Sequence, residues 1–499
     1  MKVYLMHRDR DFDPQGSTAT NGNDLIQDLE LDILVHAMAL DDKYLFDIAK
    51  AALLQSLFSV EDIRYRQGIL QDCIAHPAVV REIYAIAVES IEDRRKNWYS
   101  LWSGSGPGSI LYSSVHIIEM YIPRLGRLRK IADDNAAQFE SDGFSRFFAM
   151  IEQELTDEYT DTIKAQLTDL EFGEGVMIGS VLGQGCESVR HSLRRPNGRG
   201  GNWLHKLFSP KAPMYSFSIH PRDESGGRAL EEFRNRGINI AADALARSAD
   251  HIENFFKLLK AELAFYIGCL NLRDTVIKLD EPLCFPVPFP PGSLRNSGKK
   301  IYNLCLALHT NAKAIGNDVK AAGKNPVIIT GVNEGGKSTL LRSLGVAQLM
   351  MQCGMFVPAE SYEADICSAL FTHFRRKEDR DMKSGKFDEE LTRMEIIAGQ
   401  LRPYSLILFN ESFAATNERE GAEIARQITR ALMESEIRVI FVTHLYPFAE
   451  SLLEFRCFET LFLRADRLPN GSRSFRIIEG PPSPKSHGED LYRQVFGED

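Results

Sequence analysis

The chain has 499 residues, of which 44% are hydrophobic and 26% are charged, and 59 Lys and Arg face 69 Asp and Glu for a formal net charge of −10. These values exclude a wholly disordered chain and a collagen-like fibre. At about 100–200 residues per domain, the length predicts about three to five domains. The acidic balance argues against a surface coated in positive charge, but it allows a local basic patch, because attraction to a polyanion depends on where the charges lie.

The N-terminal stretch has no apolar core of signal-peptide length, and no run of about 18 apolar residues indicates a transmembrane helix. The eight cysteines are scattered and form no C-x-x-C pair. This spacing is typical neither of a disulfide framework nor of a zinc site. We therefore expect a cytoplasmic protein with reduced, mostly buried thiols, and we expect residues 1–23 to form an N-terminal tail.

Residues 24–275 have a helical pattern, which is clearest over residues 236–271. There, apolar residues recur in alternating steps of four and three and form an unbroken heptad seam. The seam consists of Ile238, Ala242, Leu245, Ala249, Ile252, Phe256, Leu259, Leu263, Tyr266 and Leu270. The pattern predicts one long helix. It could be a core helix of a compact bundle, but its length favours a lever, because helices in globular proteins are usually shorter.

Residues 171–228 differ in character and form a predicted insert. EFGEGVMIGSVLGQG and MYSFSIH are expected to form short strands. Between them lies a segment, residues 190–211, that has no Asp or Glu. Its cationic side chains are Arg190, Arg194, Arg195, Arg199, Lys206 and Lys211. We expect these six residues to contact phosphate groups of DNA, although a solvated loop would show the same charge run.

Residues 276–299 contain five prolines and are expected to form a linker, because proline interrupts both helices and central strands. Beyond it, residues 300–499 contain the short apolar runs PVIIT, SLILF and RVIFVTH, separated by amphipathic segments. Such runs are typical of strands that are buried on both faces. The predicted fold is multidomain: an all-α core with long lever helices and a small β-containing insert, followed by an α/β domain.

The stretch from Gly331 to Ser338 matches G-x-x-x-x-G-K-[ST], the phosphate-binding loop. An apolar strand enters it and a helix follows it, so backbone N–H groups and the helix N-terminus are expected to face a phosphate. Lys337 is expected to reach the terminal phosphates and Ser338 to bind Mg²⁺. The predicted nucleotide-binding residues are Gly331, Val332, Asn333, Glu334, Gly335, Gly336, Lys337, Ser338 and Thr339.

Two further strands are predicted to end at the same site. SLILF leads into Asn410-Glu411, where the first position normally holds an Asp that helps to hold Mg²⁺. Asn410 offers a neutral oxygen instead, and Mg²⁺ prefers anionic ones. We expect Ser338 and Asn410 to be the metal ligands, and Glu411 to activate the attacking water. His444, at the end of the third strand, is expected to contact the γ-phosphate, because ligands bind at the carboxyl ends of parallel strands.

These motifs resemble the ATPase domain of the MutS mismatch-repair family. TGVNEGGKSTLLRSLG followed by MFVPAES is similar to the family's T-G-P-N-M-G-G-K-S-T and its following F-V-P-A-E. NESFAATNEREG is similar to its D-E-x-x-x-x-T-x-x-x-x-G, with Thr416 and Gly421 in register. FVTHLYPFAE and PKSHGEDLY resemble two later family segments, so the resemblance covers about residues 300–490.

The resemblance implies an ABC-type ATPase that uses ATP and Mg²⁺ and works as a dimer. Each site of that family borrows a signature serine from the partner subunit. The matching region, DMKSGKFDEELTRM, has Gly385 at the serine position and Ser384 one residue before it. By this resemblance Ser384 is a further candidate nucleotide contact.

The first half of the chain resembles the family more weakly. IRYRQGILQD is similar to the start of the family's helical core, the 236–271 helix to its lever, and the basic segment to its DNA clamp. We expect the mismatch-reading and connector domains of full mismatch sensors to be absent, since the helical core pattern begins near Asp24.

The resulting expectation is a homodimeric ATPase clamp that uses ATP binding and hydrolysis to engage mismatched, branched or recombining DNA. The alternative is a nucleotide-switched protein-interaction module with weak or no hydrolysis and no direct DNA role. A metabolic kinase would not explain the levers. Tyr302 is a candidate for stacking on adenine, but no motif identifies that residue.

Overall fold

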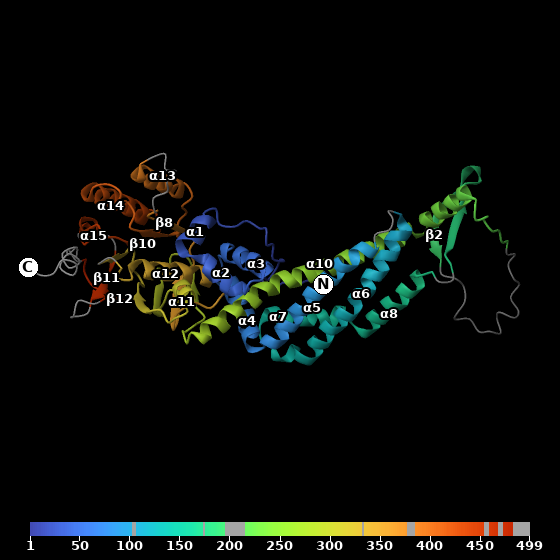
Figure 1. Ribbon diagram of the computed structural model, residues 1–499, viewed down its shortest axis with the longest axis horizontal. Helices are drawn as coiled ribbons and strands as arrows, with labels where there is room; N and C mark the ends of the chain where they lie inside the picture. Colours follow the sequence, from blue (N-terminus) through green and yellow to red (C-terminus); the bar gives the residue numbers. More distant parts are fainter. Residues whose placement is uncertain are drawn as a thin grey trace, which may run out of the picture. The chain divides into compact units, whose positions relative to one another are not determined.

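The computed structural model describes residues 1–101, 106–172, 175–194, 215–331, 334–376, 385–453, 459–467 and 473–482 (Figure 1). The chain divides into two compact units. The helical unit comprises Met1–Val3, Arg81–Gln138 and Arg146–Lys260, and the sheet unit comprises Tyr4–Val80, Phe139–Ser145 and Ala261–Asp499. None of the helices in the described part of the chain combines the length and apolar character that a membrane-spanning segment requires.

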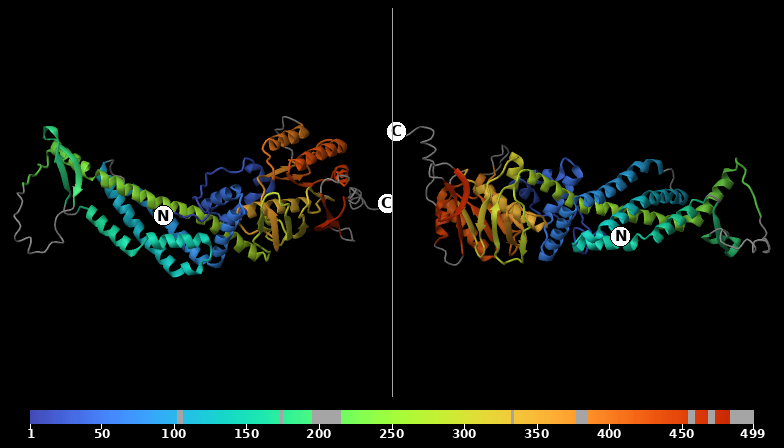
Figure 2. Two further views of the ribbon diagram at one scale, coloured as in Figure 1. Left: turned by 180° about the vertical axis from the view of Figure 1, so that it is seen from behind. Right: turned by 90° about the horizontal axis from the view of Figure 1, so that it is seen from below.

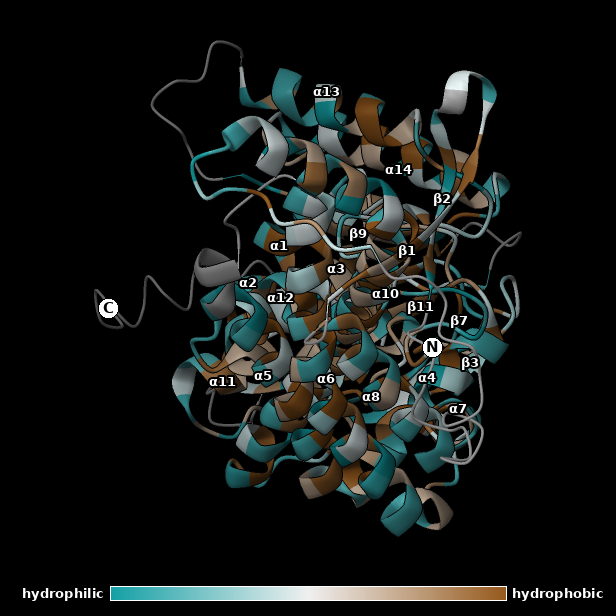
Figure 3. Cartoon of the chain, turned by 90° about the vertical axis from the view of Figure 1, so that its right-hand side faces the viewer, coloured by the Kyte–Doolittle hydropathy of each residue, from teal (hydrophilic) through white to brown (hydrophobic). Residues whose placement is uncertain are grey.

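The helical unit is built from long amphipathic helices. They are α5 (Pro77–Leu101), α6 (Pro107–Asn135), α7 (Asp142–Glu154), α8 (Asp157–Leu170) and α10 (Glu224–Lys278). In Figure 3, α6 and α8 alternate between hydrophilic and hydrophobic residues, as expected of helices with one face in a core. An ion pair of 3.2 Å between Arg94 Nε and the Glu253 carboxylate joins α5 to α10.

Helix α10 confirms the long helix predicted from the heptad seam. It is 55 residues long and extends beyond both predicted ends, so a straight helix of this length would measure roughly 80 Å. Nine of the ten seam residues are buried, and Leu245 is half-buried. The 3.5-residue spacing therefore marks buried positions correctly, whereas residues 261–272 of the helix are buried on all sides.

The insert contains one antiparallel hairpin, formed by β1 (Met177–Leu182) and β2 (Ser188–Arg194). Strand β1 lies in the first stretch predicted as a strand, but the expectation for MYSFSIH was wrong, because its described residues 215–220 form no strand. The partner of β1 is instead the beginning of the basic segment. The hairpin lies beside the beginning of α10 (Figure 2). Leu193 of β2 packs near Ile238 of α10, and a Cβ on Gly237 would lie 2.5 Å from Ile178 Cδ1. Packing against α10 therefore determines which segment pairs with β1.

The N-terminal residues of the sheet unit are packed, in contrast to the expected tail. Leu5, Met6 and Phe12 are buried. The buried Glu262 carboxylate accepts hydrogen bonds from their three backbone N–H groups, at 2.5, 2.9 and 2.9 Å. Arg66, which is also buried, donates to the Met6 carbonyl at 2.9 and 3.1 Å. These buried polar groups hold the segment against the core, and a hydropathy pattern does not reveal such pairings.

Four further helices precede the sheets in the sheet unit. They are α1 (Gly22–Leu29), α2 (Leu31–Ala39), α3 (Lys43–Leu54) and α4 (Val60–Ala75). The Asp42 and Ser59 side chains cap α3 and α4 by accepting from backbone N–H groups. Asn21, at the start of α1, donates from Nδ2 to the Leu370 carbonyl at 2.7 Å and so covers a sheet edge. The sequence places these helices before a linker, whereas they pack with the sheets.

Within the described residues, the large sheet has six strands in the order β12-β11-β6-β10-β9-β8. The strands are β6 (Val327–Thr330), β8 (Leu370–Phe374), β9 (Leu406–Asn410), β10 (Arg438–Val442), β11 (Leu461–Arg467) and β12 (Arg473–Glu479). All neighbours pair in parallel except β11 and β12. The predicted parallel sheet is thus confirmed, with an antiparallel strand at one edge.

Helices cover both faces of this sheet, and side-chain alternation along β9 separates the two faces. Leu408 faces α12 (Lys337–Gln352), where a Cβ on Gly345 would lie 2.7 Å from Leu408 Cδ1. Ile407 and Phe409 belong to the apolar cluster on the opposite face. That cluster includes residues from α13 (Lys386–Ala398), α14 (Glu418–Glu434) and α15 (Tyr446–Ser451).

A smaller sheet has the strand order β3-β7-β4-β5 in the described residues. Its strands are β3 (Val287–Phe289), β4 (Asn296–Ile301), β5 (Asn317–Lys320) and β7 (Ser361–Asp365), and α11 (Leu304–Thr310) follows β4. Residues 276–299, expected to be a linker, therefore contribute the end of α10 and two strands. Pro288 is tolerated because β3 is an edge strand.

The cysteines agree with the expectation of buried thiols. Cys73, Cys269, Cys305, Cys353 and Cys367 are free and buried, and Cys284 is free and half-buried.

Candidate functional site

The candidate site lies at the carboxyl edge of the large sheet, where the glycine-rich turn connects β6 to α12. The strands that end there are direct neighbours: Val442 of β10 pairs with Asn410 of β9 on one side and with Ile329 of β6 on the other. Ligands of parallel α/β sheets bind outside this edge. Of the predicted nucleotide-binding residues, Val332, Asn333 and Ser384 lie outside the described residues.

Two positions of the turn have room for no residue other than glycine. Gly331 and Gly336 have φ of 115° and 91°, a left-handed conformation that other residues rarely adopt. A Cβ on Gly331 would lie 3.0 Å from the Ala465 nitrogen, and one on Gly336 would lie 3.0 Å from the Phe475 carbonyl oxygen. The turn is therefore seated against β11 and β12.

Sequence reasoning missed the contribution of β12. Arg473 pairs with the Glu334 carboxylate, and so ties the turn to the first residue of that strand. Because β12 runs antiparallel to β11, its first residue lies at the same edge as the ends of the other strands. No local signal links two residues this far apart in the chain.

Lys337 is the first residue of α12, and its side chain is 4% exposed. Its Nζ donates to the Gly331 carbonyl oxygen at 2.8 Å. Burial lowers the pKa of Lys337, and the nearby Glu411 carboxylate opposes that shift. Lys337 and Glu411, predicted from separate motifs, therefore lie close enough for their charges to interact.

The two predicted metal ligands lie side by side. Ser338 Oγ donates to Asn410 Oδ1 at 2.7 Å, which connects the start of α12 to the end of β9. Both candidate metal ligands are neutral oxygens. The described residues contain no group of three His, Cys, Asp or Glu that could hold a metal ion alone. This donor set fits Mg²⁺ brought by a nucleotide, because Mg²⁺ uses one or two protein ligands together with phosphates and water.

The predicted catalytic residues occupy neighbouring positions at this edge. Glu411 has a φ of 55° and donates its backbone N–H to the Val442 carbonyl at 2.9 Å. Glu411 is partly exposed, whereas the following Ser412 and Phe413 are buried. His444 is exposed, and the preceding Thr443 anchors it through an N–H bond of 3.1 Å to the Ile329 carbonyl.

Behind Glu411 lies a buried histidine that sequence reasoning did not single out. His373, in β8, contacts the Ser412 hydroxyl through Nδ1 at 2.7 Å and the Glu390 carbonyl through Nε2 at 3.0 Å. Burial lowers the pKa of His373 to about 4. The only local signal for it is a polar side chain inside the apolar run LFTHF. In contrast, Tyr302 is 1% exposed, which removes it as a candidate for stacking on a base.

The basic segment is described only at its start. Arg190 and Arg194 are exposed on β2, and Arg190 has a φ of 53°. Arg195, Arg199, Lys206 and Lys211 lie outside the described residues. The predicted DNA contacts therefore remain a prediction for all six residues.

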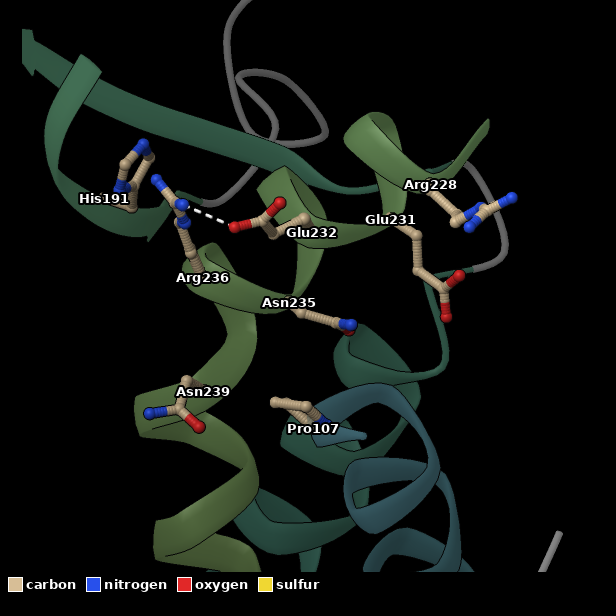
Figure 4. A pocket seen from close by; sticks show the side chains of 8 residues that line it. All are labelled: Pro107, His191, Arg228, Glu231, Glu232, Asn235, Arg236 and Asn239. Carbon is tan, nitrogen blue, oxygen red and sulfur yellow. Dashed lines mark hydrogen bonds and ion pairs between the residues drawn. The ribbon is translucent and has the colours of Figure 1, made fainter. Parts of the chain in front are cut away.

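The helical unit has an open hollow near this hairpin (Figure 4). Its lining comes from α6, β2 and the first turns of α10 and has both signs of charge. The lining residues are Pro107, His191, Arg228, Glu231, Glu232, Asn235, Arg236 and Asn239. Arg236 pairs with Glu232, Arg228 pairs with Glu224 at 3.3 Å, and His191 Nε2 lies 2.7 Å from Ser188 Oγ. Both arginines are thus paired with carboxylates, and the mixed charges of the lining do not define one class of ligand.

Fold and site together define an α/β protein whose glycine-rich turn, helix N-terminus and carboxylate meet at the carboxyl edge of a parallel sheet. Comparison with known families makes this class specific. The family model of the MutS2 N-terminal domain matches residues 59–279, and that of MutS domain V matches residues 327–492. The chain belongs to the MutS family.

Individual relatives are similar over shorter stretches. MutS protein homolog 4 of Mus musculus is 27% identical over 246 residues, which cover 46% of this chain and 26% of that protein. Endonuclease MutS2 of Lacticaseibacillus casei is 35% identical over 137 residues, 27% of this chain and 17% of the relative. DNA mismatch repair protein MutS of Chloroflexus aurantiacus is 34% identical over 135 residues, 26% of this chain and 14% of the relative. The matched stretches thus span about a quarter or less of each relative.

Proposed function

We propose that this chain binds and hydrolyses ATP at the 331–339 turn and uses the nucleotide cycle to control engagement of mismatched, branched or recombining DNA. The observation that carries the proposal is the convergence of Lys337, Ser338, Asn410 and Glu411 at one edge of the sheet. The name of the relative from Chloroflexus aurantiacus, a DNA mismatch repair protein, supports the choice of DNA as the partner.

Each residue at the edge has a distinct role in this proposal. The N–H groups of the turn and the N-terminus of α12 bind the phosphates, and Lys337 neutralises their charge. Ser338 and Asn410 are the residues that would hold Mg²⁺, which supplies charge neutralisation of the transferred phosphoryl group. Glu411 orients the attacking water and accepts its proton, while His444 contacts the γ-phosphate.

The DNA contact is assigned to the basic segment. Its cations bind the phosphate backbone, which gives affinity without sequence preference and with strong salt dependence. A homodimer would place two such segments around one duplex, and Ser384 of each subunit would complete the partner's ATP site. Two copies of α10 would then link the ATP sites to the DNA contacts.

A second candidate function is a nucleotide-switched protein-interaction module. The neutral Asn410 favours the interaction module, because weaker metal binding slows hydrolysis. The net charge of −10 also favours it over DNA binding. In this alternative ATP binding persists while DNA binding is absent.

Filter binding to duplex and branched DNA, with and without ATP, separates the two functions. Lys337→Ala should abolish ATP binding and any ATP-dependent change in DNA affinity, because a buried cation at the phosphate site is removed. Lys313→Ala, at an exposed position of the same unit, is the matched control. DNA binding that responds to ATP equally in wild type and Lys337→Ala would refute the proposed site. ATP binding without any DNA binding would favour the interaction module.

A further inference from the structure

The end of β9 is connected to helix α13 through His373. His373 and Ser412 are fully buried, and Glu390 is 5% exposed. The imidazole lies between the other two residues, with contacts of 2.7 Å to Ser412 Oγ and 3.0 Å to the Glu390 carbonyl oxygen. Ser412 directly follows Glu411, and Glu390 lies in the second turn of α13. The three residues thus form a continuous hydrogen-bonded path from the residue next to the candidate catalytic Glu411 to a helix.

The chemistry of the partners determines the direction of each hydrogen bond. A carbonyl oxygen only accepts, so Nε2 of His373 must carry the hydrogen that binds Glu390. The Ser412 hydroxyl donates to the His373 carbonyl oxygen at 2.5 Å. In a neutral imidazole with its hydrogen on Nε2, Nδ1 has no hydrogen, so its 2.7 Å contact with Ser412 Oγ shares that same hydroxyl proton. Ser412 is therefore tied to His373 through both the ring and the backbone.

Other contacts reinforce the same connection. The Phe413 ring stacks on the His373 ring, with centroids 5.3 Å apart and an interplanar angle of 20°. Burial raises the pKa of the Glu390 carboxyl group, and the backbone of Phe413 opposes that shift. At the other end of the segment, the Arg375 N–H donates to the Asn410 carbonyl at 3.0 Å. Asn410, Ser412 and Phe413 are thus each fastened to β8 or to the residue that follows it.

We propose that His373 is a positioning residue that couples the nucleotide at Asn410 and Glu411 to helix α13, so that nucleotide binding changes the order of α13. This inference rests on the proposed nucleotide site. The physical reason is that a buried polar group without a partner is strongly disfavoured. A shift of Ser412 must therefore carry His373 and the α13 backbone with it, rather than break either hydrogen bond.

Three substitutions interrupt the path at different points. His373→Asn retains an amide oxygen near the position of Nδ1 and loses the bond to Glu390. His373→Gln retains an amide N–H near the position of Nε2 and loses the bond to Ser412. Ser412→Ala removes the hydroxyl and leaves the imidazole intact. Ile397→Val, in the apolar cluster at the end of α13, perturbs the packing of that helix without touching the path and serves as the control.

The test measures the full chain with and without AMP-PNP and Mg²⁺. Calorimetry gives the affinity, and hydrogen–deuterium exchange with mass spectrometry follows residues 386–398. In wild type and Ile397→Val we expect AMP-PNP to slow α13 exchange several-fold. The three path variants should bind AMP-PNP with unchanged affinity but lose this response.

The outcomes separate the two proposals. If wild type does not bind AMP-PNP, the proposed nucleotide site is wrong and this inference falls with it. If wild type binds but α13 exchange does not change, or if the path variants retain the response, the coupling role of His373 is refuted while the nucleotide site stands. If the His373 variants do not fold, Ser412→Ala against Ile397→Val decides the matter.

Discussion

Asn410 places a neutral amide oxygen beside the Ser338 hydroxyl, at 2.7 Å, in a position where an anionic oxygen would bind Mg²⁺ more strongly. The pair is geometrically suited to one metal ion but supplies no charge. Glu411, the next residue, brings a carboxylate to this part of the edge. The metal dependence of the site should therefore be sensitive to one charge at position 410.

Asn410→Asp should lower the Mg²⁺ concentration needed for half-maximal nucleotide binding by about tenfold, a change of the size seen when groups around a metal are altered. The measurement is a Mg²⁺ titration of nucleotide binding by fluorescence or calorimetry. Asn417→Asp is the matched control, because Asn417 caps α14 and an aspartate preserves that cap. An unchanged Mg²⁺ requirement in Asn410→Asp would show that this residue does not face the metal.

The buried Glu262 leads to a second prediction, which concerns the pH dependence of stability. Burial raises the pKa of Glu262 from 4.5 to about 7. A carboxyl group whose pKa is raised by folding contributes its full stability below pH 4.5 and loses it as the pH rises through about 7. The free energy of unfolding of wild type relative to Glu262→Gln should accordingly fall between pH 5 and pH 8, by at most about 3 kcal/mol.

Denaturant unfolding of both proteins across this range checks the Glu262 prediction. His7 and His373 act in the opposite direction, since burial lowers the pKa of each to about 3 and about 4. Their contribution is present above pH 6.5 and is lost on acidification, but it is common to both proteins and cancels in the comparison. A difference that does not vary with pH would contradict the role of Glu262.

Among the elements, α12 and α6 contain glycines in opposite environments. In α12, a Cβ at Gly345 would lie 2.7 Å from Leu408 Cδ1 and 2.8 Å from Leu29 Cδ2. In α6, a Cβ at Gly126 would meet nothing within 4 Å. The close approach of α12 to the sheet thus depends on a missing side chain, whereas the glycine in α6 only weakens its helix.

The same substitution should therefore have opposite effects at these two positions. Gly345→Ala is expected to lower the free energy of unfolding by about 1–3 kcal/mol through overpacking. Gly126→Ala is expected to raise it by about 1 kcal/mol through helix propensity. Denaturant unfolding of the two variants tests this, and equal shifts of the same sign would contradict the packing described for α12.

For the whole molecule, the decisive question is where DNA would bind an acidic protein. The basic segment has six cations and no acidic residue, whereas Arg228, Arg236 and Arg247 of α10 are each paired with a carboxylate one helical turn away. Pairing of this kind cancels the field that attracts a polyanion. The two groups of arginines therefore make a matched comparison.

Replacing Arg194, Arg195 and Arg199 together by Gln should weaken DNA binding and reduce the slope of log K against log salt by about 0.9 for each phosphate that the variant no longer neutralises. The control replaces the same number of paired arginines, namely Arg228, Arg236 and Arg247. Filter binding over a range of salt concentrations measures both. A slope that the first triple variant leaves unchanged would rule out the basic segment as the site of DNA binding.

Much of this molecule follows from patterns of local sequence. The heptad seam predicts the long helix, and nine of the ten seam residues are buried, because burial of one stripe repeats every 3.5 residues. The apolar runs predict β6, β9 and β10, and the glycine spacing predicts the turn between β6 and α12. The parallel order of these strands brings Ser338, Asn410 and Glu411 to one edge, so their proximity could also be expected from sequence.

Only the tertiary structure decided the features that depend on partners far along the chain. Glu262 holds residues 5–12 in the core, β2 rather than MYSFSIH pairs with β1, and Arg473 reaches the turn through Glu334. His373 is a buried histidine whose significance comes entirely from Ser412 and Glu390. The physical reason is the same in each case. Periodicity records which side of an element is buried, whereas a hydrogen bond or ion pair between distant residues leaves no period in the sequence.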